Sequence, residues 1–418
     1  MSELTLTVSR AHPRAPKAPS ARQVQKLLDS AKSLEALLKS EGHSLKIAVG
    51  DWSTMLGAKK YSTHIPVFNF SDYRACARAL QSPRLYTFAV LFFRNKLVIS
   101  GSLESVIDIL YSINIGNDAP QSVQEKYAFL IFRTIKAVFP WFARRFESNF
   151  HYSLDARAYE LFLDKYLQYT CGRFLPKTSS IDEAQIEKFR LIQDWVSETI
   201  GGLRGKTHLD VGSGWGGLVA YFSQHYGTKS IGLTNCAPQS DYAAQKFGIS
   251  NTLVDDFSSL ENMQEVFDFV TVIGMSEHVV GPLKDKLLQD VHARLRDGGV
   301  LYFQTIAKPD VWVGGDAYRI AQKLIFPGHD LDTQEQCEAR FARAGFQVAH
   351  AEDHSSDYAR TTYEWGSRLR ANFPQFEKLI GLRNASLFLL YLFYASKLFN
   401  TGRGKLLRYA LVKRANSN

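Results

Sequence analysis

The sequence is poor in the residues and segments that build metal centres, disulfide scaffolds and membrane spans. Only four of its 418 residues are cysteines, and these have no paired spacing: Cys76, Cys171, Cys236 and Cys337. This scatter argues against a metal site and indicates a reducing compartment. The very apolar stretch of residues 384–399 falls short of the roughly 18 apolar residues that would span a bilayer. We therefore expect a buried helix there.

Signatures of nucleic-acid binding are also missing, whereas positive charge is in excess. The chain has no zinc pattern, no aromatic RNA-binding signature and no long Lys/Arg block. Its net charge of +9 favours an acidic partner surface such as anionic phospholipid. A basic protein without such a partner stays open. The same holds for the basic residues near the C-terminus, which are candidates for headgroup contact or for a solvated tail: Lys397, Arg403, Lys405, Arg408, Lys413 and Arg414.

Composition along the chain predicts a tail and two domains. Residues 1–22 carry three prolines and several basic residues, which indicates a flexible tail. Residues 23–125 are expected to form a smaller, lipid-associated accessory domain, which begins with a helix whose apolar residues recur at helical spacing from Val24 to Leu38. The apolar run 88–93, followed by Arg94, Asn95 and Lys96, predicts strands joined by a turn. Residues 126–418 are expected to form the larger domain.

A glycine run is the most informative feature of the larger domain. Residues 208–217 read HLDVGSGWGG, with four glycines within six residues after an apolar stretch. The pattern predicts a strand that ends near Asp210, a tight turn and the start of a helix. Glycines in such a turn let the backbone approach a ligand closely, so a nucleotide-like cofactor is the natural occupant. An ordinary strand-to-helix turn is the alternative.

The residues that follow predict strands alternating with helices. This alternation implies an α/β fold with a doubly wound, Rossmann-like parallel sheet, in which ligands bind at the carboxyl ends of the strands. The glycine spacing departs from G-x-G-x-x-G, and no lone Asp or Glu closes the second strand. We therefore predict S-adenosylmethionine rather than NAD as the cofactor.

Ordered blocks over much of the chain resemble one enzyme family. LDVGSGWGG at residues 209–217 and GMSEH at 274–278 are similar to the LDIGCGWGG and GMFEH of the cyclopropane-fatty-acyl-phospholipid synthases. Five further blocks agree, and the resemblance spans roughly residues 148–415. The blocks lie at 151–152 with 160–164, at 168–171, at 180–185, at 325–328 and at 358–361 ahead of Trp365.

The resemblance implies a class I methyltransferase that acts on lipid. Such an enzyme transfers a methyl group from S-adenosylmethionine to the cis double bond of an unsaturated phospholipid acyl chain, and the carbocation closes to a cyclopropane ring on proton loss. Relatives of the synthases release a methylene- or methyl-branched fatty acid instead. Three alternatives stay open, namely that branched product, methylation of a soluble small molecule and a noncatalytic lipid-binding role. A homodimer is also possible for such an enzyme. The expected location is cytoplasmic, at the inner face of the membrane.

The family resemblance also implies a base site built around bicarbonate. The groups that hold it map to Cys171, Glu277, Gln304, Ile306 and Tyr358. Gln304 stands where the family has histidine. Because glutamine donates hydrogen bonds but neither carries charge nor relays a proton, weaker bicarbonate binding or its loss is expected. Cys171 has a second interpretation as an inert buried thiol.

The same block matches give a set of cofactor-binding residues. Phe257 is expected to stack on adenine, with core burial as the alternative, and Asp256 to bond the adenine amino group. The full set is Tyr152, Tyr169, Asp210, Gly212, Gly214, Gly216, Thr234, Asn235, Gln239, Asp256 and Phe257.

Overall fold

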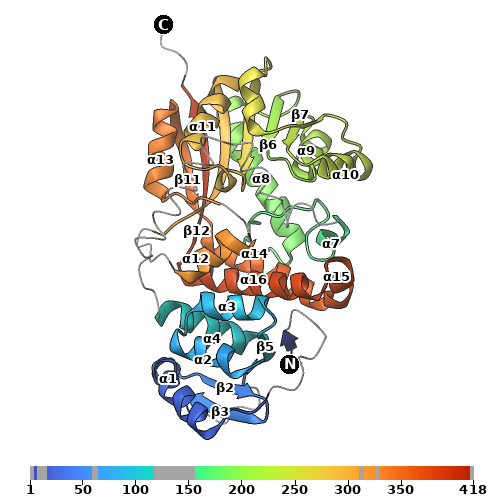
Figure 1. Cartoon of the computed structure of the whole chain (residues 1–418). Helices are drawn as coiled ribbons and strands as arrows, with labels where there is room; N and C mark the ends of the chain where they lie inside the picture. The colour runs from blue at the N-terminus through green and yellow to red at the C-terminus, as the bar shows by residue number, and fades with distance from the viewer. Residues whose placement is uncertain are drawn as a thin grey trace. The chain divides into compact units, whose positions relative to one another are not determined.

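The structure, a computed structural model, describes residues 4–6, 17–58, 65–116, 156–309, 315–325 and 329–414 (Figure 1). It divides into two compact units. The first comprises Met1–Val123, Val313–Ile325 and Phe373–Lys397. The second comprises Gln124–Trp312, Phe326–Asn372 and Leu398–Asn418. The three-part division expected from composition stays a prediction.

The second unit contains a seven-stranded sheet in the order β11-β12-β10-β9-β6-β7-β8. All neighbours pair in parallel except β12, which runs antiparallel to both β10 and β11. This arrangement confirms the predicted α/β fold with a doubly wound sheet. The strands are β6 Thr207–Val211, β7 Lys229–Thr234, β8 Thr252–Val254, β9 Phe267–Ile273, β10 Leu295–Ala307, β11 Phe346–Asp353 and β12 Lys405–Lys413.

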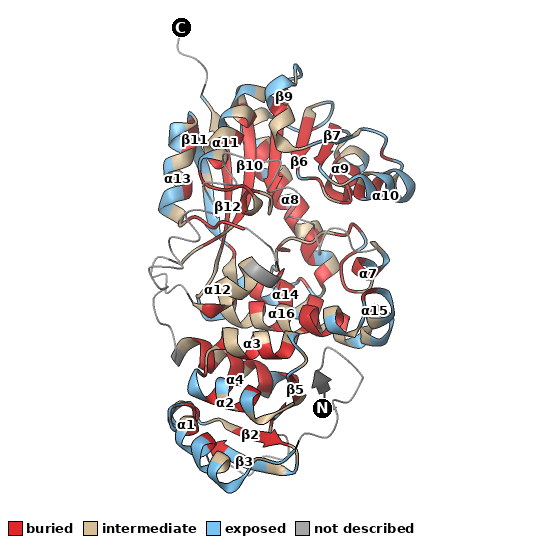
Figure 2. Ribbon diagram, viewed as in Figure 1, coloured by how far each residue is buried: buried red, intermediate tan, exposed pale blue. Residues whose placement is uncertain are grey.

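Helices cover both faces of this sheet, so its central strands are buried (Figure 2). On one face the apolar cluster includes Leu287 and Val291 of α11 and Phe341 of α13. On the other it includes Ile192 of α8 and Leu218 of α9. The helical segments of the unit are α7 Ala156–Glu160, α8 Ile181–Ile200, α9 Gly217–Tyr221, η1 Phe222–Tyr226, α10 Ala237–Phe247, η2 Phe257–Asn262, η3 Ser276–His278, α11 Pro282–Arg294, α13 Gln334–Arg343 and α14 Ser355–Ala371.

The first unit is a five-stranded sheet, ordered β1-β5-β4-β2-β3, with its own helices. Within the segment expected to be a flexible tail, β1 pairs with β5, and the Ser20 hydroxyl accepts from the backbone of Gln23 to cap α1. The elements are β1 Leu4–Leu6, α1 Ala21–Ser40, β2 Ser44–Val49, β3 Trp52–Gly57, β4 Val67–Phe70, α2 Tyr73–Gln81, α3 Leu85–Phe93, β5 Leu97–Gly101, α4 Leu103–Gly116, α12 Asp316–Ile320, η4 Ala321–Ile325, α15 Phe373–Ile380 and most of α16 Leu382–Asn400.

One secondary-structure prediction in this unit is wrong. The apolar run 88–93 belongs to the helix α3, not to a strand. Leu85, Phe88 and Phe92 are buried at helical spacing, and the helix ends where Asn95 adopts a positive φ of 55°. A run that is apolar at nearly every position has neither the helical nor the strand periodicity of apolar residues. Tertiary packing therefore decides whether it forms a helix or a strand.

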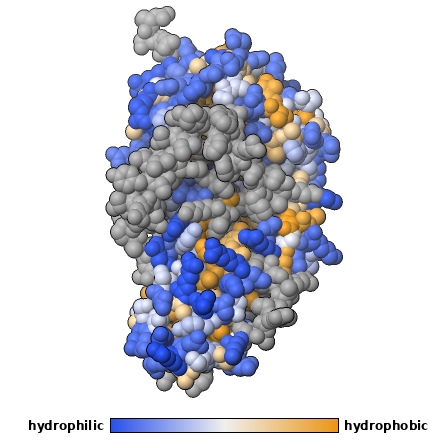
Figure 3. Space-filling model, in the orientation of Figure 1, coloured by the Kyte–Doolittle hydropathy of each residue, from blue (hydrophilic) through white to orange (hydrophobic). Residues whose placement is uncertain are grey.

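The very apolar C-terminal stretch does form a helix, α16, as expected. Leu389, Leu392 and Phe388 on it are wholly buried. No helix among the described residues is long and apolar enough to cross a bilayer. On the face drawn in Figure 3, hydrophilic residues predominate and smaller apolar patches lie between them.

A histidine lies in the core of the sheet. The two ring nitrogens of His208 on β6 lie 3.0 Å from the Ser230 hydroxyl and 2.9 Å from the Thr271 hydroxyl, and the ring stacks on Phe269. Burial disfavours the charged ring and lowers the pKa of His208 to about 3. His208 therefore stays neutral in the folded chain over the ordinary pH range.

This burial predicts an acid-sensitive fold. Between about pH 6.5 and 3 the unfolded chain protonates at residue 208 while the folded chain does not. The free energy of unfolding should then fall by up to about 1.4 kcal/mol per pH unit through this one group. In H208Q, which keeps polar atoms for both hydroxyls, the loss measured by urea unfolding from pH 7 to 4 should be smaller. An identical pH dependence in both proteins would contradict the assignment.

Candidate active site

The glycine turn after β6 has the geometry that a ligand-binding loop needs. Gly212, Gly214 and Gly216 all have positive φ, of 86°, 53° and 74°. The backbone N–H groups of Gly212 and Ser213 both donate to the Leu233 carbonyl, at 2.8 and 2.9 Å, which ties the turn to the end of β7. The turn is therefore held rigidly at the carboxyl edge of the sheet.

The glycines of this turn serve two different needs. A Cβ on Gly216 would lie 2.8 Å from the Cβ of Ala243, and one on Gly217 only 1.9 Å from the Tyr166 carbonyl oxygen. A side chain at either position would collide with another part of the protein, so both positions require glycine. Gly214 differs, because a Cβ there would have no atom within 4 Å. A ligand can therefore approach the backbone at Gly214 without meeting protein atoms there.

Polar residues around the turn are bound mainly to one another. Asp210 accepts a hydrogen bond from the Thr271 hydroxyl at 2.7 Å, and burial raises its pKa to about 6. Thr234 donates to the Gln239 side chain at 2.9 Å, and both residues are buried. Asn235, in contrast, is exposed. The strand-end residues thus brace the rim of the site, and Asn235 lies open at it.

The acidic loop after β8 offers one aromatic ring. Asp256 accepts from the backbone N–H of Ser258 at 3.0 Å and so caps η2. Phe257 is half-buried and packs against the apolar cluster of the sheet. Core packing thus accounts for part of this ring. Tyr152 lies outside the described residues.

A second wall of the site is the segment 164–174, which includes Tyr169 and Cys171. Asp164 is buried and accepts from the backbone N–H groups of Tyr166 and Gln168, at 2.9 and 2.7 Å. These bonds stabilise a turn in which Leu167 has a positive φ of 49°. Burial raises the pKa of the Asp164 carboxyl.

A buried lysine on α8 holds the next residues of this wall. Lys188 Nζ donates to the Gln168 side chain at 2.7 Å and to the Thr170 hydroxyl at 2.9 Å. The side chain is wholly buried, and burial lowers its pKa to about 7. A Cβ on Gly274 would lie 3.1 Å from Thr170, so the wall meets the end of β9 there.

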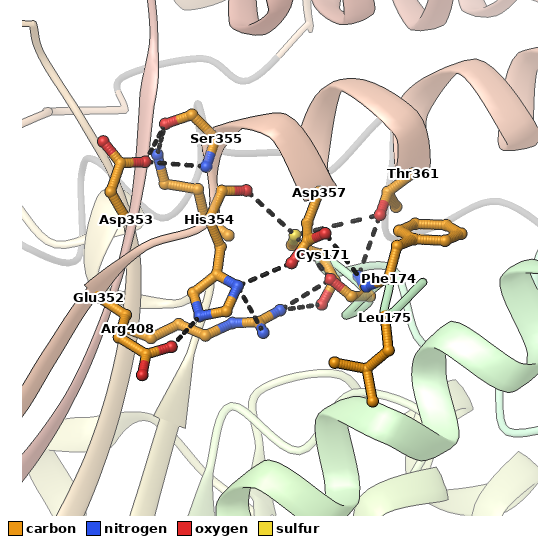
Figure 4. Close-up of polar contacts among 12 residues, drawn as sticks. Cys171, Phe174, Leu175, Glu352, Asp353, His354, Ser355, Asp357, Thr361 and Arg408 are labelled. Carbon is orange, nitrogen blue, oxygen red and sulfur yellow. Dashed lines mark hydrogen bonds and ion pairs between the residues drawn. The ribbon is translucent and has the colours of Figure 1, made fainter. Parts of the chain in front are cut away.

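A buried arginine on β12 holds the last part of this wall, at Cys171 and Gly172 (Figure 4). Arg408 Nη2 donates to the carbonyls of Cys171 and Gly172, at 2.8 and 2.9 Å, and Nε donates to Gln304 Oε1 at 2.9 Å. Nη1 lies 3.4 Å from the ring of His354, which in turn contacts Asp357. Arg408 is wholly buried, so its proposed place among headgroup-facing residues is wrong. The signal for this role was a cation in the middle of a strand whose other interior residues carry no charge.

Contacts join the five residues expected to form the base site into two groups, Glu277 with Ile306 and Cys171 with Gln304 and Tyr358. Glu277 Oε1 accepts from the Ile306 N–H at 2.7 Å, and burial raises the pKa of its carboxyl. The Cys171 thiol donates to the Gly172 carbonyl at 3.0 Å, and burial raises its pKa to about 12. The Tyr358 N–H donates to the His354 carbonyl, which also lies 3.9 Å from the Cys171 sulfur.

Two of these groups already have partners within the protein. The Ile306 N–H is taken by Glu277, and the Gln304 oxygen is taken by Arg408. A small anion at these residues would therefore have to bind through other groups, such as the Gln304 amino group.

Aromatic rings line the path from the glycine turn to α14. Trp215 of the turn lies 4.4 Å from Tyr159, Tyr159 lies 5.6 Å from Tyr169, and Tyr169 lies 5.1 Å from Trp365, measured between ring centres. Tyr358 follows, 6.3 Å from Trp365, and Phe399 lies 4.6 Å from Tyr358. We call these six residues the aromatic wall. The sequence did not predict their contact, because they come from five separate segments.

The second unit has the fold of the class I S-adenosylmethionine-dependent methyltransferases. The chain belongs to the mycolic acid cyclopropane synthetase family, whose model matches residues 143–409. The family predicted from sequence, the enzyme class and the cofactor S-adenosylmethionine are thereby confirmed.

Individual relatives agree. The chain is 29% identical over 246 residues to a probable fatty acid methyltransferase of Mycobacterium tuberculosis, covering 58% of this chain and 56% of that protein. It is 28% identical over 244 residues to the cyclopropane-fatty-acyl-phospholipid synthase of Escherichia coli K12, covering 58% and 61%. The matches thus span little more than half of these two relatives.

A solved structure gives the same fold. Mycolic acid cyclopropane synthase CmaA1 complexed with SAH and CTAB superposes with a TM-score of 0.58 at 25% identity. The match covers 63% of this chain and 96% of that one.

The open space at Gly214 predicts a selective loss of cofactor binding. In G214A the added methyl group should weaken S-adenosylhomocysteine binding about tenfold or more, measured by calorimetry. The matched control is G298A, because Gly298 also has a positive φ and no atom within 4 Å of a Cβ. Both changes should cost about 1–2 kcal/mol of backbone strain. Equal affinity in G214A and G298A would rule out a ligand at this turn.

Proposed function

We propose that this chain methylates the cis double bond of an unsaturated phospholipid acyl chain and so forms a cyclopropane fatty acid. The observation that carries the proposal is the aromatic wall, which joins the glycine turn to Tyr358 within a family of cyclopropane synthetases. When bound, S-adenosylmethionine supplies an electrophilic methyl carbon. Gly212, Gly214 and Gly216 would hold it, with Asn235 at the rim.

The aromatic wall suits the charge that develops during this reaction. Addition of a methyl group to an alkene leaves a carbocation, which water would destroy. Ring faces attract a cation by about 0.5–2 kcal/mol and exclude water at the same time. Trp365 and Tyr358 are both buried, so the wall is dry where it meets α14.

Glu277 is the group best placed to take up the proton that ring closure releases. It lies just beyond β9, at the carboxyl edge of the sheet, and accepts from the Ile306 N–H and, at 3.3 Å, from the Ser276 hydroxyl. Burial raises its pKa, which makes the carboxylate a stronger proton acceptor than an exposed glutamate. No step of this scheme needs bicarbonate.

The membrane is the proposed source of the substrate. The chain carries a net charge of +9, which favours anionic phospholipid at the inner face of the membrane. Burial of each methylene of an extracted acyl chain contributes about 0.8 kcal/mol. A homodimer stays a sequence-based prediction.

Labelled S-adenosylmethionine and liposomes of a monounsaturated phospholipid test this function. We expect label in the lipid and a cyclopropane ester in the mass spectrum of the released methyl esters. A methylene- or methyl-branched ester would show that the enzyme methylates the double bond without closing a ring. Label in a soluble acceptor, with none in lipid, would exclude lipid methylation altogether.

If Glu277 is the base, its substitution should lower turnover without changing cofactor binding. In E277Q the product should fall about 100-fold or more because the amide cannot accept the proton, while S-adenosylhomocysteine affinity stays unchanged. E265Q, at an exposed position, is the matched control. Unchanged turnover in E277Q would remove the proposed role of this carboxylate.

A further inference from the structure

Gln304 and Arg408 form a buried pair across two strands. They are directly opposite each other in the antiparallel ladder between β10 and β12, so their side chains lie on the same face of the sheet. Arg408 Nε donates to Gln304 Oε1 at 2.9 Å. Gln304 is 1% exposed and Arg408 is 0% exposed.

The guanidinium of this pair has a fixed orientation. Its Nη2 donates to the carbonyls of Cys171 and Gly172, and its Nη1 lies beside the His354 ring. Because the guanidinium is planar, bonds on Nε and Nη2 leave it no rotational freedom. Figure 4 shows Arg408 between His354 and the backbone of Cys171.

This orientation decides which end of the Gln304 carboxamide faces the arginine. Arginine is only a donor, so the carboxamide oxygen must point toward it and the amino group away from it. Among the described residues, Gln304 Nε2 has no hydrogen-bond partner, and it is not one of the fully enclosed polar atoms. The Gln304 carbonyl also accepts from the Gly274 N–H at 3.0 Å, which places the residue beside the segment that carries Glu277.

We propose that Arg408 is a positioning residue that holds the Gln304 amino group as a fixed, neutral donor to an oxygen anion in the active site. The inference rests on the proposed function. The oxygen anion is of carboxylate type, supplied by Glu277 or by bicarbonate. Gln304 stabilises this base and cannot itself take the proton, so proton removal depends on the neighbouring anion.

Substitutions at position 304 separate this role from a purely structural one. In Q304E the carboxylate still accepts from Arg408, so the melting temperature should not fall, but the donor is lost. We expect turnover at pH 8 to fall about tenfold or more with unchanged S-adenosylhomocysteine affinity. Q304H, whose ring accepts at one nitrogen and donates at the other, should retain turnover.

A double-mutant cycle tests the part of Arg408. R408K should lower turnover in the wild-type background, because a lysine cannot bond Gln304 and both carbonyls in one plane. The same change should lower turnover by a smaller factor in Q304M, where there is no carboxamide to orient and only the bonds to the Cys171 and Gly172 carbonyls are disturbed. Additive losses would overturn the positioning role.

The control is Q347E, at an exposed position of β11. Assays with bicarbonate-free buffer and with added bicarbonate identify the source of the anion. Wild-type turnover in Q304E at pH 8 would overturn the inference, since Gln304 would then serve only as an acceptor. That result differs from failure of the proposed function, in which the wild-type protein itself yields no lipid product.

Discussion

A single buried guanidinium is the constraint on which this active site depends. Arg408 ties β12 to β10 through Gln304 and ties the sheet to the wall of residues 164–174 through two backbone carbonyls. Removing one partner of a buried charge costs about 3–5 kcal/mol, because the charge is then left without compensation. The His354 and Asp357 side chains beside it complete the polar cluster. The position of Cys171 is thus set by a residue far away in the sequence.

The two ends of the site follow different physical rules. At the glycine turn, positive φ angles and close approaches of Ala243 and Tyr166 require residues without a side chain. At the other end, bulky rings and buried polar groups fill the space, and Lys188 and Asp164 satisfy the backbone of the wall. The glycine turn therefore lets a ligand approach the backbone closely, and the other end of the site excludes water.

Much of the site could be predicted because its backbone demands are local. The positive φ angles at Gly212, Gly214 and Gly216 favour glycine through the backbone alone, and strands buried on both faces read as apolar runs separated by helices. The resemblance then supplied Glu277, Gln304 and Cys171, whose partners in the structure are Ile306, Arg408 and the His354 carbonyl. The run at residues 88–93 misled because it carries no period, and packing made it helix α3.

The sequence by itself determined the sheet, the cofactor turn and the family, since each leaves a pattern among neighbouring residues. Tertiary structure alone decided that Arg408 lies in the site rather than at the surface, that Val313–Ile325 and Phe373–Lys397 belong to the first unit, and that six aromatic rings form one wall. The physical reason is separation along the chain. Arg408 meets Gln304 across 104 residues and Cys171 across 237, and no local spacing or propensity records such a contact.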